Sequence, residues 1–309
     1  MKTNNYTEMK LPLTGVIPPI VTPLLSNTKL DEAGLEKLIE HLIAGGVHGV
    51  FLLGTTGEAP NLSYELRKTF IKKACKLIRN RIPVVVGITD TSITGSLAIA
   101  ATAHEAGADA LVISAPYYLP MSQEEMAAYL EYLVPQLPLP FMLYNMPSCT
   151  KMHMSLNTVR KAKELGAIGI KDSSGDLAYL YALIEEFKDS PEFSIIVGTE
   201  LFIPETMING GHGAVPGGAN LFPKLFVDLY DASKKKDARA IAAFREKIIQ
   251  IEDKVYNVGH ESSKYIKSIK CALSIMGICN GFVAMPFRQF GPEQQKQLAA
   301  NLQEMVSKN

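Results

Sequence analysis

The sequence predicts an α/β fold, a (β/α)8 TIM barrel with a C-terminal three-helix appendage. Three observations predict it: short apolar runs recur up to about residue 234, amphipathic stretches with helix-start signals lie between them, and no such run follows. Runs that are apolar at every position are typical of parallel strands, because helices cover both faces of such a sheet. Eight strand–helix units within roughly 220 residues fit this barrel.

The predicted strands are too short to be helices, and several end at glycine, proline, serine or threonine. In chain order they are Gly15–Val21, Gly49–Leu53, Pro83–Ile88, Ala110–Ser114, Pro140–Tyr144, Ile168–Lys171, Phe193–Val197 and Gly213–Pro216. An open, doubly wound sheet is the alternative fold. The glycine-rich first turn that marks such a sheet is absent from the sequence.

The stretches between the strands carry helix signals. Asp31 precedes a segment whose apolar stripe includes Leu35 and Leu42, so an acidic N-cap is expected there. Ser63 and Ser122 are each followed by early acidic residues, a pattern typical of capped helix starts.

The pattern changes near residue 235. Residues 235–256, 262–276 and 292–306 are each expected to form a helix, with no strand between them. We therefore predict a catalytic barrel over residues 1–234 and a helical region over residues 235–309. This second region has the character of an appendage and not of an independent catalytic domain.

Composition excludes several classes of function. The 31 basic and 31 acidic residues cancel, so the positive surface needed to bind nucleic acid is not expected. No run of 18 apolar residues and no apolar signal core occurs, so we expect a cytoplasmic protein outside the membrane. The four cysteines and six histidines show no metal-ligand spacing, and no nucleotide-binding motif is present, so no metal and no cofactor are expected.

The chemistry of a barrel enzyme lies where its strands end. Gly54-Thr55-Thr56-Gly57-Glu58 follows the second predicted strand. Its hydroxyl and backbone N–H groups could hold an anion such as a carboxylate. A plain turn is the alternative reading of the same residues.

A lysine ends the sixth predicted strand. Lys171 follows an apolar run and precedes Asp172, while Tyr144 ends the fifth run. An ammonium is costly to bury, and a free amine is the nucleophile of Schiff-base catalysis. Lys171 is therefore either an imine-forming residue or the partner of Asp172 in a salt bridge.

Taken together, these motifs resemble the dihydrodipicolinate synthase/N-acetylneuraminate lyase family. The similarity extends from about residue 12 to about residue 300. The motifs that carry it are Gly15–Pro23, Gly54–Glu58, Pro116–Tyr118, Tyr144–Pro147, Gly169–Asp172 and Gly210–Gly213. The resemblance implies a class I enzyme that needs no metal, and that joins pyruvate to an aldehyde or cleaves the reverse product.

The resemblance also implies roles for individual residues. Lys171 would form an imine with the keto carbon of pyruvate, and Tyr144 would move protons beside it. Thr55 would link Tyr144 to Tyr118, which in many relatives reaches in from a neighbouring subunit. A homotetramer built from two dimers is therefore the expected assembly.

Further residues would bind the substrate. Thr56, together with Thr55 and backbone groups near Gly54, would hold the pyruvate carboxylate. Val215 would place its carbonyl group near the imine.

Departures from the family pattern bear on the aldehyde. Dihydrodipicolinate synthases usually carry an arginine where this chain has Cys149, and a thiol cannot form the bidentate clamp that arginine gives a carboxylate. Lys151, two residues on, is the residue that could partly replace it. A solvated loop lysine is the alternative.

Sialic acid lyases carry two acids after the seventh strand and a serine after the eighth. This chain has Gly198-Thr199-Glu200, with one acid, and Gly217 in place of the serine. Ser173 resembles a hydroxyl found in aldolases for 2-keto-3-deoxy sugar acids. We expect Gly198, Thr199, Glu200, Ser173 and Cys149 to contact the aldehyde part of the substrate.

The leading hypothesis is thus an aldolase for a 2-keto-3-deoxy sugar acid. A 4-hydroxy-tetrahydrodipicolinate synthase and an N-acetylneuraminate lyase are the enzyme alternatives. A non-catalytic barrel that binds a 2-oxo acid is the alternative outside enzymes. The sequence pattern leaves the aldehyde and the direction of the reaction open.

Overall fold

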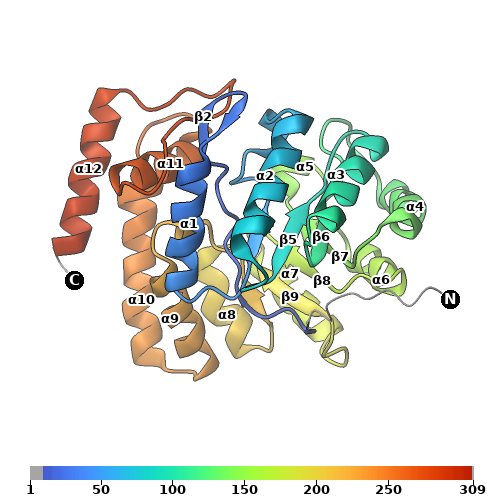
Figure 1. Ribbon diagram of the computed structural model, residues 1–309. Coiled ribbons are helices and arrows are strands. Elements are labelled where there is room, and N and C mark those ends of the chain that lie inside the picture. Colours follow the sequence, from blue (N-terminus) through green and yellow to red (C-terminus); the bar gives the residue numbers. More distant parts are fainter. Residues whose placement is uncertain (1–9, 308–309) are drawn as a thin grey trace.

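The computed structural model describes residues 10–307 (Figure 1), so the prediction that the N-terminus lacks a signal core concerns residues mostly outside it. Eight parallel strands form one sheet in the order β1-β10-β9-β8-β7-β6-β5-β4. They are β1 (Gly15–Val16), β4 (Val50–Leu52), β5 (Val84–Gly87), β6 (Ala110–Ile113), β7 (Phe141–Asn145), β8 (Gly169–Asp172), β9 (Ser194–Val197) and β10 (Gly213–Ala214). Each falls within, or overlaps, a strand that the sequence predicts.

The segment after β1 closes the sheet into a barrel. Pro19 forms a parallel bridge with Phe51, whose N–H donates to the carbonyl of Pro18 at 2.9 Å. The predicted (β/α)8 fold is therefore confirmed. The first strand is shorter than predicted because Pro18 and Pro19 have no N–H to donate to a ladder. A small antiparallel hairpin, β2 (Leu24–Ser26) and β3 (Lys29–Leu30), was not predicted.

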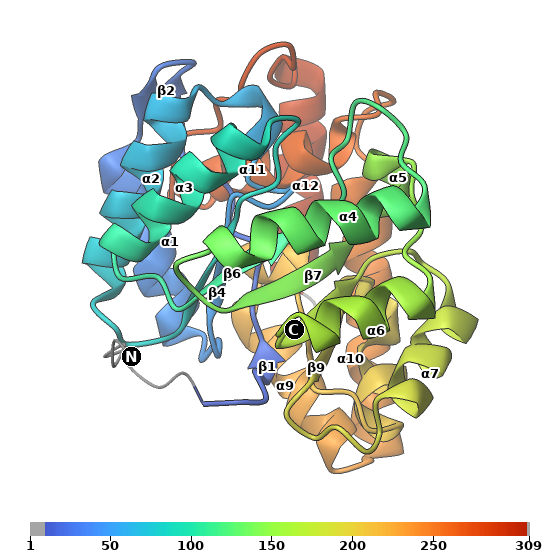
Figure 2. The ribbon, with the colours of Figure 1, turned by 90° about the vertical axis from the view of Figure 1, so that its right-hand side faces the viewer.

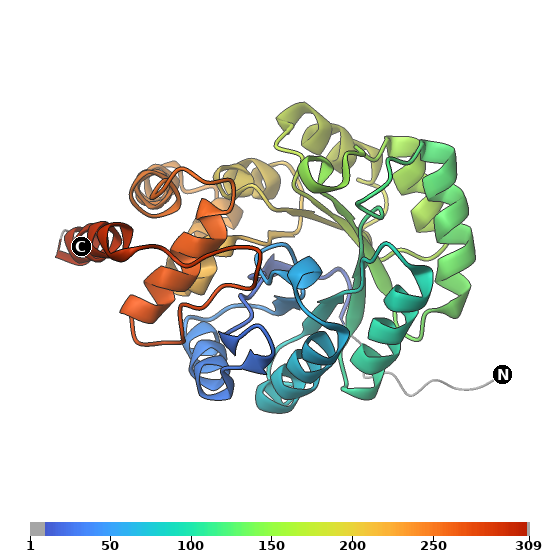
Figure 3. The ribbon, with the colours of Figure 1, turned by 90° about the horizontal axis from the view of Figure 1, so that it is seen from above.

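Helices alternate with the strands and surround the barrel (Figures 2 and 3). The predicted caps are present: Asp31 accepts from the Gly34 N–H at 3.0 Å, Ser63 caps the next helix, and Ser122 forms a capping box with Glu125. The helices are α1 (Glu32–Ala44), α2 (Tyr64–Ile78), α3 (Ile93–Glu105), α4 (Gln123–Leu133), α5 (Pro147–Thr150), α6 (Leu156–Glu164), α7 (Leu177–Glu186), α8 (Ile203–Ile208) and α9 (Pro223–Lys234).

The inside of the barrel is filled by side chains and forms the floor of the site. This inner core consists mainly of branched and aromatic residues, as is usual for the fold. It contains Leu13, Ile17, Phe51, Val85, Ala110, Val112, Met142, Tyr144, Ile196 and Val215. These side chains separate the two ends of the barrel interior.

Three further helices follow the barrel, as predicted: α10 (Ala238–Ile251), α11 (Lys264–Ile275) and α12 (Pro292–Ser307). The first begins at Ala238 and not at residue 235, because Asp237 caps it by accepting from the Ala240 N–H at 3.0 Å. One π-helical segment, Glu252–Tyr256, continues α10.

These helices lie together at one side of the barrel (Figures 1 and 3). They share one hydrophobic core with the barrel helices, to which Ile251, Leu273 and Leu298 contribute. The division into two domains at residue 234 stays a prediction. Within residues 10–307, none of the helices combines the length and the apolar character needed to cross a membrane.

Candidate active site

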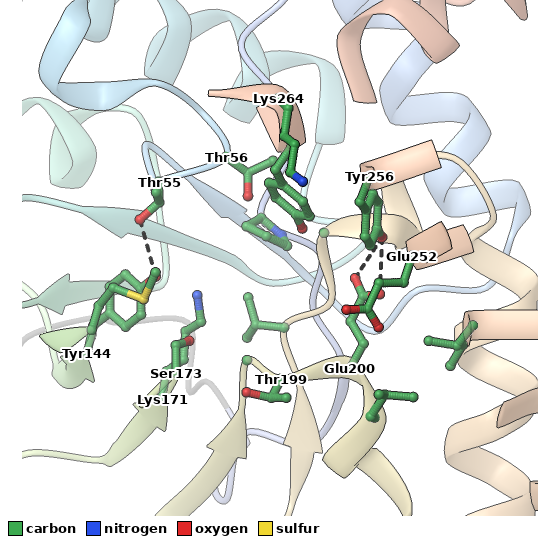
Figure 4. Close-up of a pocket in the computed structure, with 18 of the residues that line it drawn as sticks. Thr55, Thr56, Tyr144, Lys171, Ser173, Thr199, Glu200, Glu252, Tyr256 and Lys264 are labelled. Atoms are coloured by element: carbon green, nitrogen blue, oxygen red, sulfur yellow. Dashed lines mark hydrogen bonds between the residues drawn. The ribbon is translucent and has the colours of Figure 1, made fainter. Parts of the chain in front are cut away.

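A cavity of about 460 Å³ opens at the carboxyl ends of the strands (Figure 4). Most of the predicted site residues line it: Thr55, Thr56, Tyr144, Lys171, Ser173, Gly198, Thr199, Glu200 and Val215. They come from the ends of five different strands, so the barrel closure brings them together.

Lys171 projects into this cavity from β8. It pairs in register with Tyr144 of β7, so the two side chains share one face of the sheet. The amine nitrogen lies 3.9 Å from the centre of the Tyr144 ring and 5.2 Å from that of Phe51. The side chain is 5% exposed, so the amine sits in a largely aromatic pocket at the base of the cavity.

Asp172 faces the other side of the strand. Its carboxylate accepts hydrogen bonds from the Asn145 amide at 2.8 Å and from the Ser174 hydroxyl at 2.9 Å. Burial raises the pKa of this carboxyl, while those hydrogen bonds lower it. The contacts of Asp172 thus differ from the salt bridge with Lys171 that was the alternative reading of the sequence.

The Tyr144 hydroxyl lies 3.2 Å from Thr55 Oγ1, within hydrogen-bond distance (Figure 4). This is the first link of the predicted hydroxyl relay. Tyr118 is 77% exposed and does not line this cavity. It also does not line a second, neighbouring cavity that is described below. The second link is therefore not made within one chain.

The loop that holds the two threonines is folded tightly. The Gly57 N–H donates to the Gly54 carbonyl at 3.1 Å, and the Glu58 N–H donates to the Thr55 carbonyl at 3.0 Å. Thr22 adds a hydrogen bond from its hydroxyl to the Gly57 carbonyl at 2.7 Å. Thr56 is thereby held at the cavity wall.

Glu58 ties this loop to the C-terminal helices. Its Oε2 accepts from Lys270 Nζ on α11 at 2.5 Å, and its Oε1 accepts from the Ala284 N–H at 2.7 Å. Both side chains of the ion pair are fully buried. Burial lowers the pKa of the Lys270 ammonium, while Glu58 acts to raise it.

Glu200 forms the far wall of the cavity. Its carboxylate accepts from the Gly218 N–H at 2.7 Å and from the Tyr256 hydroxyl at 3.0 Å. Burial raises its pKa to about 7, and the nearby Glu252 adds to this, while the two hydrogen bonds act in the opposite direction.

A second cavity of about 300 Å³ lies behind Tyr144 and Thr55. Two of the predicted substrate-binding residues, Gly54 and Cys149, line this cavity and not the larger one. Cys149 is exposed at its edge. Lys151 follows α5 in a left-handed conformation and lines neither of these two cavities, and its replacement of the missing arginine stays a prediction.

Sequence reasoning missed the part of the site that comes from the C-terminal helices. Glu252 and Tyr256 of the π-helical segment, Asn257, and Lys264 and Tyr265 of α11 all line the larger cavity. The four-residue spacing of Glu252 and Tyr256 would place them on one helix face. The sequence does not show that this face meets the strand ends.

No group of three or more His, Cys, Asp and Glu side chains within residues 10–307 is arranged to hold a metal ion. An amine, a phenol and two threonine hydroxyls lie together at the mouth of the parallel barrel.

Comparison with known proteins identifies the class. Residues 12–305 match the model of the dihydrodipicolinate synthetase family. The chain belongs to this family, so the resemblance predicted from its motifs is confirmed and the protein is a carbon–carbon lyase. The family includes both aldolases and synthases, as the following relatives illustrate.

The structure of dihydrodipicolinate synthase from Bacteroides thetaiotaomicron is similar, with 47% identity, a TM-score of 0.93, and coverage of 96% of this chain and 100% of that one. YagE from Escherichia coli K12, solved in complex with pyruvate, has 29% identity and a TM-score of 0.89, with coverage of 96% and 99%. In sequence, the "Putative 2-dehydro-3-deoxy-D-gluconate aldolase YagE" is 31% identical over 85% of this chain and 87% of its own. The 4-hydroxy-tetrahydrodipicolinate synthase of Phenylobacterium zucineum is 30% identical over 88% of this chain and 90% of its own.

Proposed function

We propose that this protein is a class I aldolase that cleaves or forms a 2-keto-3-deoxy sugar acid through pyruvate bound as an imine. The observation that carries the proposal is the buried Lys171 amine at the cavity base, 3.9 Å from the Tyr144 ring centre. A nucleophilic amine beside a phenol is the pair that Schiff-base chemistry requires.

In the cleavage direction, the neutral Lys171 amine adds to the keto carbon, and loss of water gives a protonated imine. In that dehydration Tyr144 gives its proton to the leaving hydroxyl, and the resulting phenolate then takes the proton of the hydroxyl on the fourth carbon as the bond between the third and fourth carbons breaks. The aldehyde leaves, and the electron pair of the broken bond flows into the imine to give an enamine. Protonation at the third carbon and addition of water release pyruvate and free Lys171.

The imine is the electron acceptor in this sequence, so the proposed mechanism needs no metal. Thr56 and Thr55, with backbone N–H groups of their loop, would bind the substrate carboxylate beside Lys171. Val215 lines the same region and would place its carbonyl near the imine. Gly54 leaves room for the Phe51 ring, because a β-carbon there would lie 2.8 Å from a ring carbon.

The part of the cavity that would hold the aldehyde portion of the substrate is suited to hydroxyl groups. Ser173, Thr199 and Glu200 line the cavity beyond Lys171, whereas Cys149 stands where a synthase arginine is expected and lies in the neighbouring cavity. The relative named as a 2-dehydro-3-deoxy-D-gluconate aldolase supports this substrate class.

A 4-hydroxy-tetrahydrodipicolinate synthase is the second candidate. The observation that favours it is the 47% identity to the chain from Bacteroides thetaiotaomicron described as a dihydrodipicolinate synthase. In that reaction pyruvate on Lys171 would condense with aspartate semialdehyde, and the cavity would have to hold a second carboxylate.

We further propose that the protein acts as a homotetramer of two dimers. Tyr118 and Leu119 are 77% and 71% exposed on the loop after β6, as apolar residues of an interface would be in a single chain. Tyr118 of a second copy would reach Thr55 and complete the hydroxyl relay.

Borohydride trapping with pyruvate tests the mechanism. We expect a mass gain equal to reduced pyruvate on Lys171 in the wild type and none in Lys171→Ala. An unchanged mass in the wild type would support the non-catalytic binder instead. Pyruvate release from 2-keto-3-deoxy sugar acids, compared with condensation of pyruvate and aspartate semialdehyde, then separates the two candidate reactions.

A further inference from the structure

Two glycines in the cavity wall leave room for hydroxyl groups from the C-terminal region. A β-carbon on Gly217 would lie 1.7 Å from the Tyr265 hydroxyl oxygen, and one on Gly218 would lie 2.2 Å from that of Tyr256. Neither contact is sterically possible, so the tyrosines occupy the space that a side chain at these positions would need. The glycines and the tyrosines fit each other as one unit.

The two phenols form part of a continuous polar wall. Their rings meet edge to face, with centres 4.7 Å apart. The Tyr256 hydroxyl donates to Glu200 at 3.0 Å, and Tyr256 and Thr56 are both near enough to the Tyr265 hydroxyl to lower its pKa, which burial raises. The wall therefore runs from the far acid to the threonine loop beside Lys171, and both phenols line the cavity.

We propose that Tyr265 and Tyr256, with Glu200, form a subsite for the hydroxyl groups of the aldehyde part of the substrate. The Tyr265 hydroxyl takes the place of the serine that sialic acid lyases carry at the position of Gly217. The subsite deepens the proposed function and rests on it, because the hydroxyls it binds belong to the aldehyde released from Lys171.

The charge of this wall selects against an acidic aldehyde. Glu200 and Glu252 both line it, and each raises the cost of placing a carboxylate there. Lys264, whose ammonium donates to Asn257 Oδ1 at 2.8 Å, lines the cavity too and offsets one of the two acids, so the acids still outnumber the cation. The favoured acceptor is an uncharged aldehyde with neighbouring hydroxyls.

A pair of matched aldehydes tests the subsite. Glyceraldehyde and propanal have the same carbon chain, and propanal lacks the hydroxyls. Each would be condensed with pyruvate by the wild type, Tyr265→Phe, Tyr256→Phe and Gly217→Ala. Tyr129→Phe, which removes the hydroxyl of a buried tyrosine on α4 outside the cavity, is the control.

We expect Tyr265→Phe to lower kcat/KM for glyceraldehyde by roughly 10-fold to 100-fold and that for propanal by less than about 3-fold, because one hydrogen-bond partner is removed. Gly217→Ala should show the same selective loss, since the added carbon displaces the phenol. Tyr129→Phe should leave the ratio of the two substrates unchanged.

Equal losses for both aldehydes, or none, would overturn the subsite. So would a wild type that prefers aspartate semialdehyde to glyceraldehyde. Borohydride trapping of pyruvate, run on every variant, separates this failure from that of the proposed function. If the wild type traps pyruvate but shows no hydroxyl preference, only the subsite is wrong; if it traps none, the aldolase proposal is wrong as well.

Discussion

The two halves of the cavity are built in different ways. In one half, ladder hydrogen bonds fix Lys171 and Tyr144 on their strands, and Thr55 stands in the loop that follows β4. The other half, with Tyr256 and Tyr265, comes from helices that follow the barrel in sequence and pack beside it. In the proposed mechanism the strand half holds the groups that react, whereas the helix half offers hydroxyls and acids to the rest of the substrate.

This difference separates chemistry from specificity. A rigid strand half can keep its geometry while the helix half changes, which is how one barrel serves several substrates. Changes in the strand half should thus abolish turnover of every substrate. Changes in the helix half should alter substrate preference.

Lys171→Ala should abolish the chemistry of the strand half while leaving the fold intact. Without the amine no imine can form, so we expect pyruvate release to fall to the background rate with every substrate. The amount of pyruvate released is measured by coupling it to the reduction of pyruvate by a second enzyme. Circular dichroism checks that the variant is folded. Turnover that persists in a folded Lys171→Ala protein would contradict the proposed role.

Tyr144→Phe should leave the imine but slow proton transfer. The loss of a general acid–base group typically costs about 10²-fold to 10⁴-fold in rate, so we expect kcat to fall in that range while pyruvate is still trapped. Rapid-quench trapping measures the imine, and steady-state kinetics measure kcat. A normal kcat would show that another group moves the proton.

Lys270→Met tests the link between the two halves. It leaves Glu58 charged and buried without its cation, so we expect about 3–5 kcal/mol loss in the free energy of unfolding. Urea unfolding measures the loss. Lys224→Met, which removes an exposed ion pair with Asp228 on α9, should cost less than about 1 kcal/mol.

Adding Glu58→Gln to Lys270→Met should recover part of that stability, because no buried charge then remains. A double variant as unstable as the sum of the single ones would mean that the two residues do not act as a pair.

Glu200→Gln should change how the stability of the native state depends on pH. The native pKa of about 7 lies above the ordinary 4.5, so the native carboxyl retains a proton that the unfolded one releases between these values. Its ionisation therefore destabilises the native state increasingly as pH rises through this window. We expect Glu200→Gln to raise Tm relative to the wild type more at about pH 8 than at about pH 5. An equal difference at both values would contradict the raised pKa.

The sequence predicts the strand half well because its signals are local. Lys171 ends a continuously apolar run, and the threonines follow another, so the barrel rule that strand ends meet at one rim places them together. The contributions of Tyr265 and Glu252 could not be predicted, because they depend on how α11 and the end of α10 dock on that rim. Likewise, Gly217 reads as a missing serine in the sequence, and only the packing shows the phenol that fills its place.

The Glu58–Lys270 pair also bears on synthesis at the ribosome. The two residues are 212 positions apart, so at 5–20 residues per second roughly 10–40 s separate the emergence of the carboxylate from that of its cation. During this interval the nascent threonine loop lacks its anchor. A partly translated chain that already contains Lys171 and Tyr144 would thus still lack the ion pair that fixes this loop.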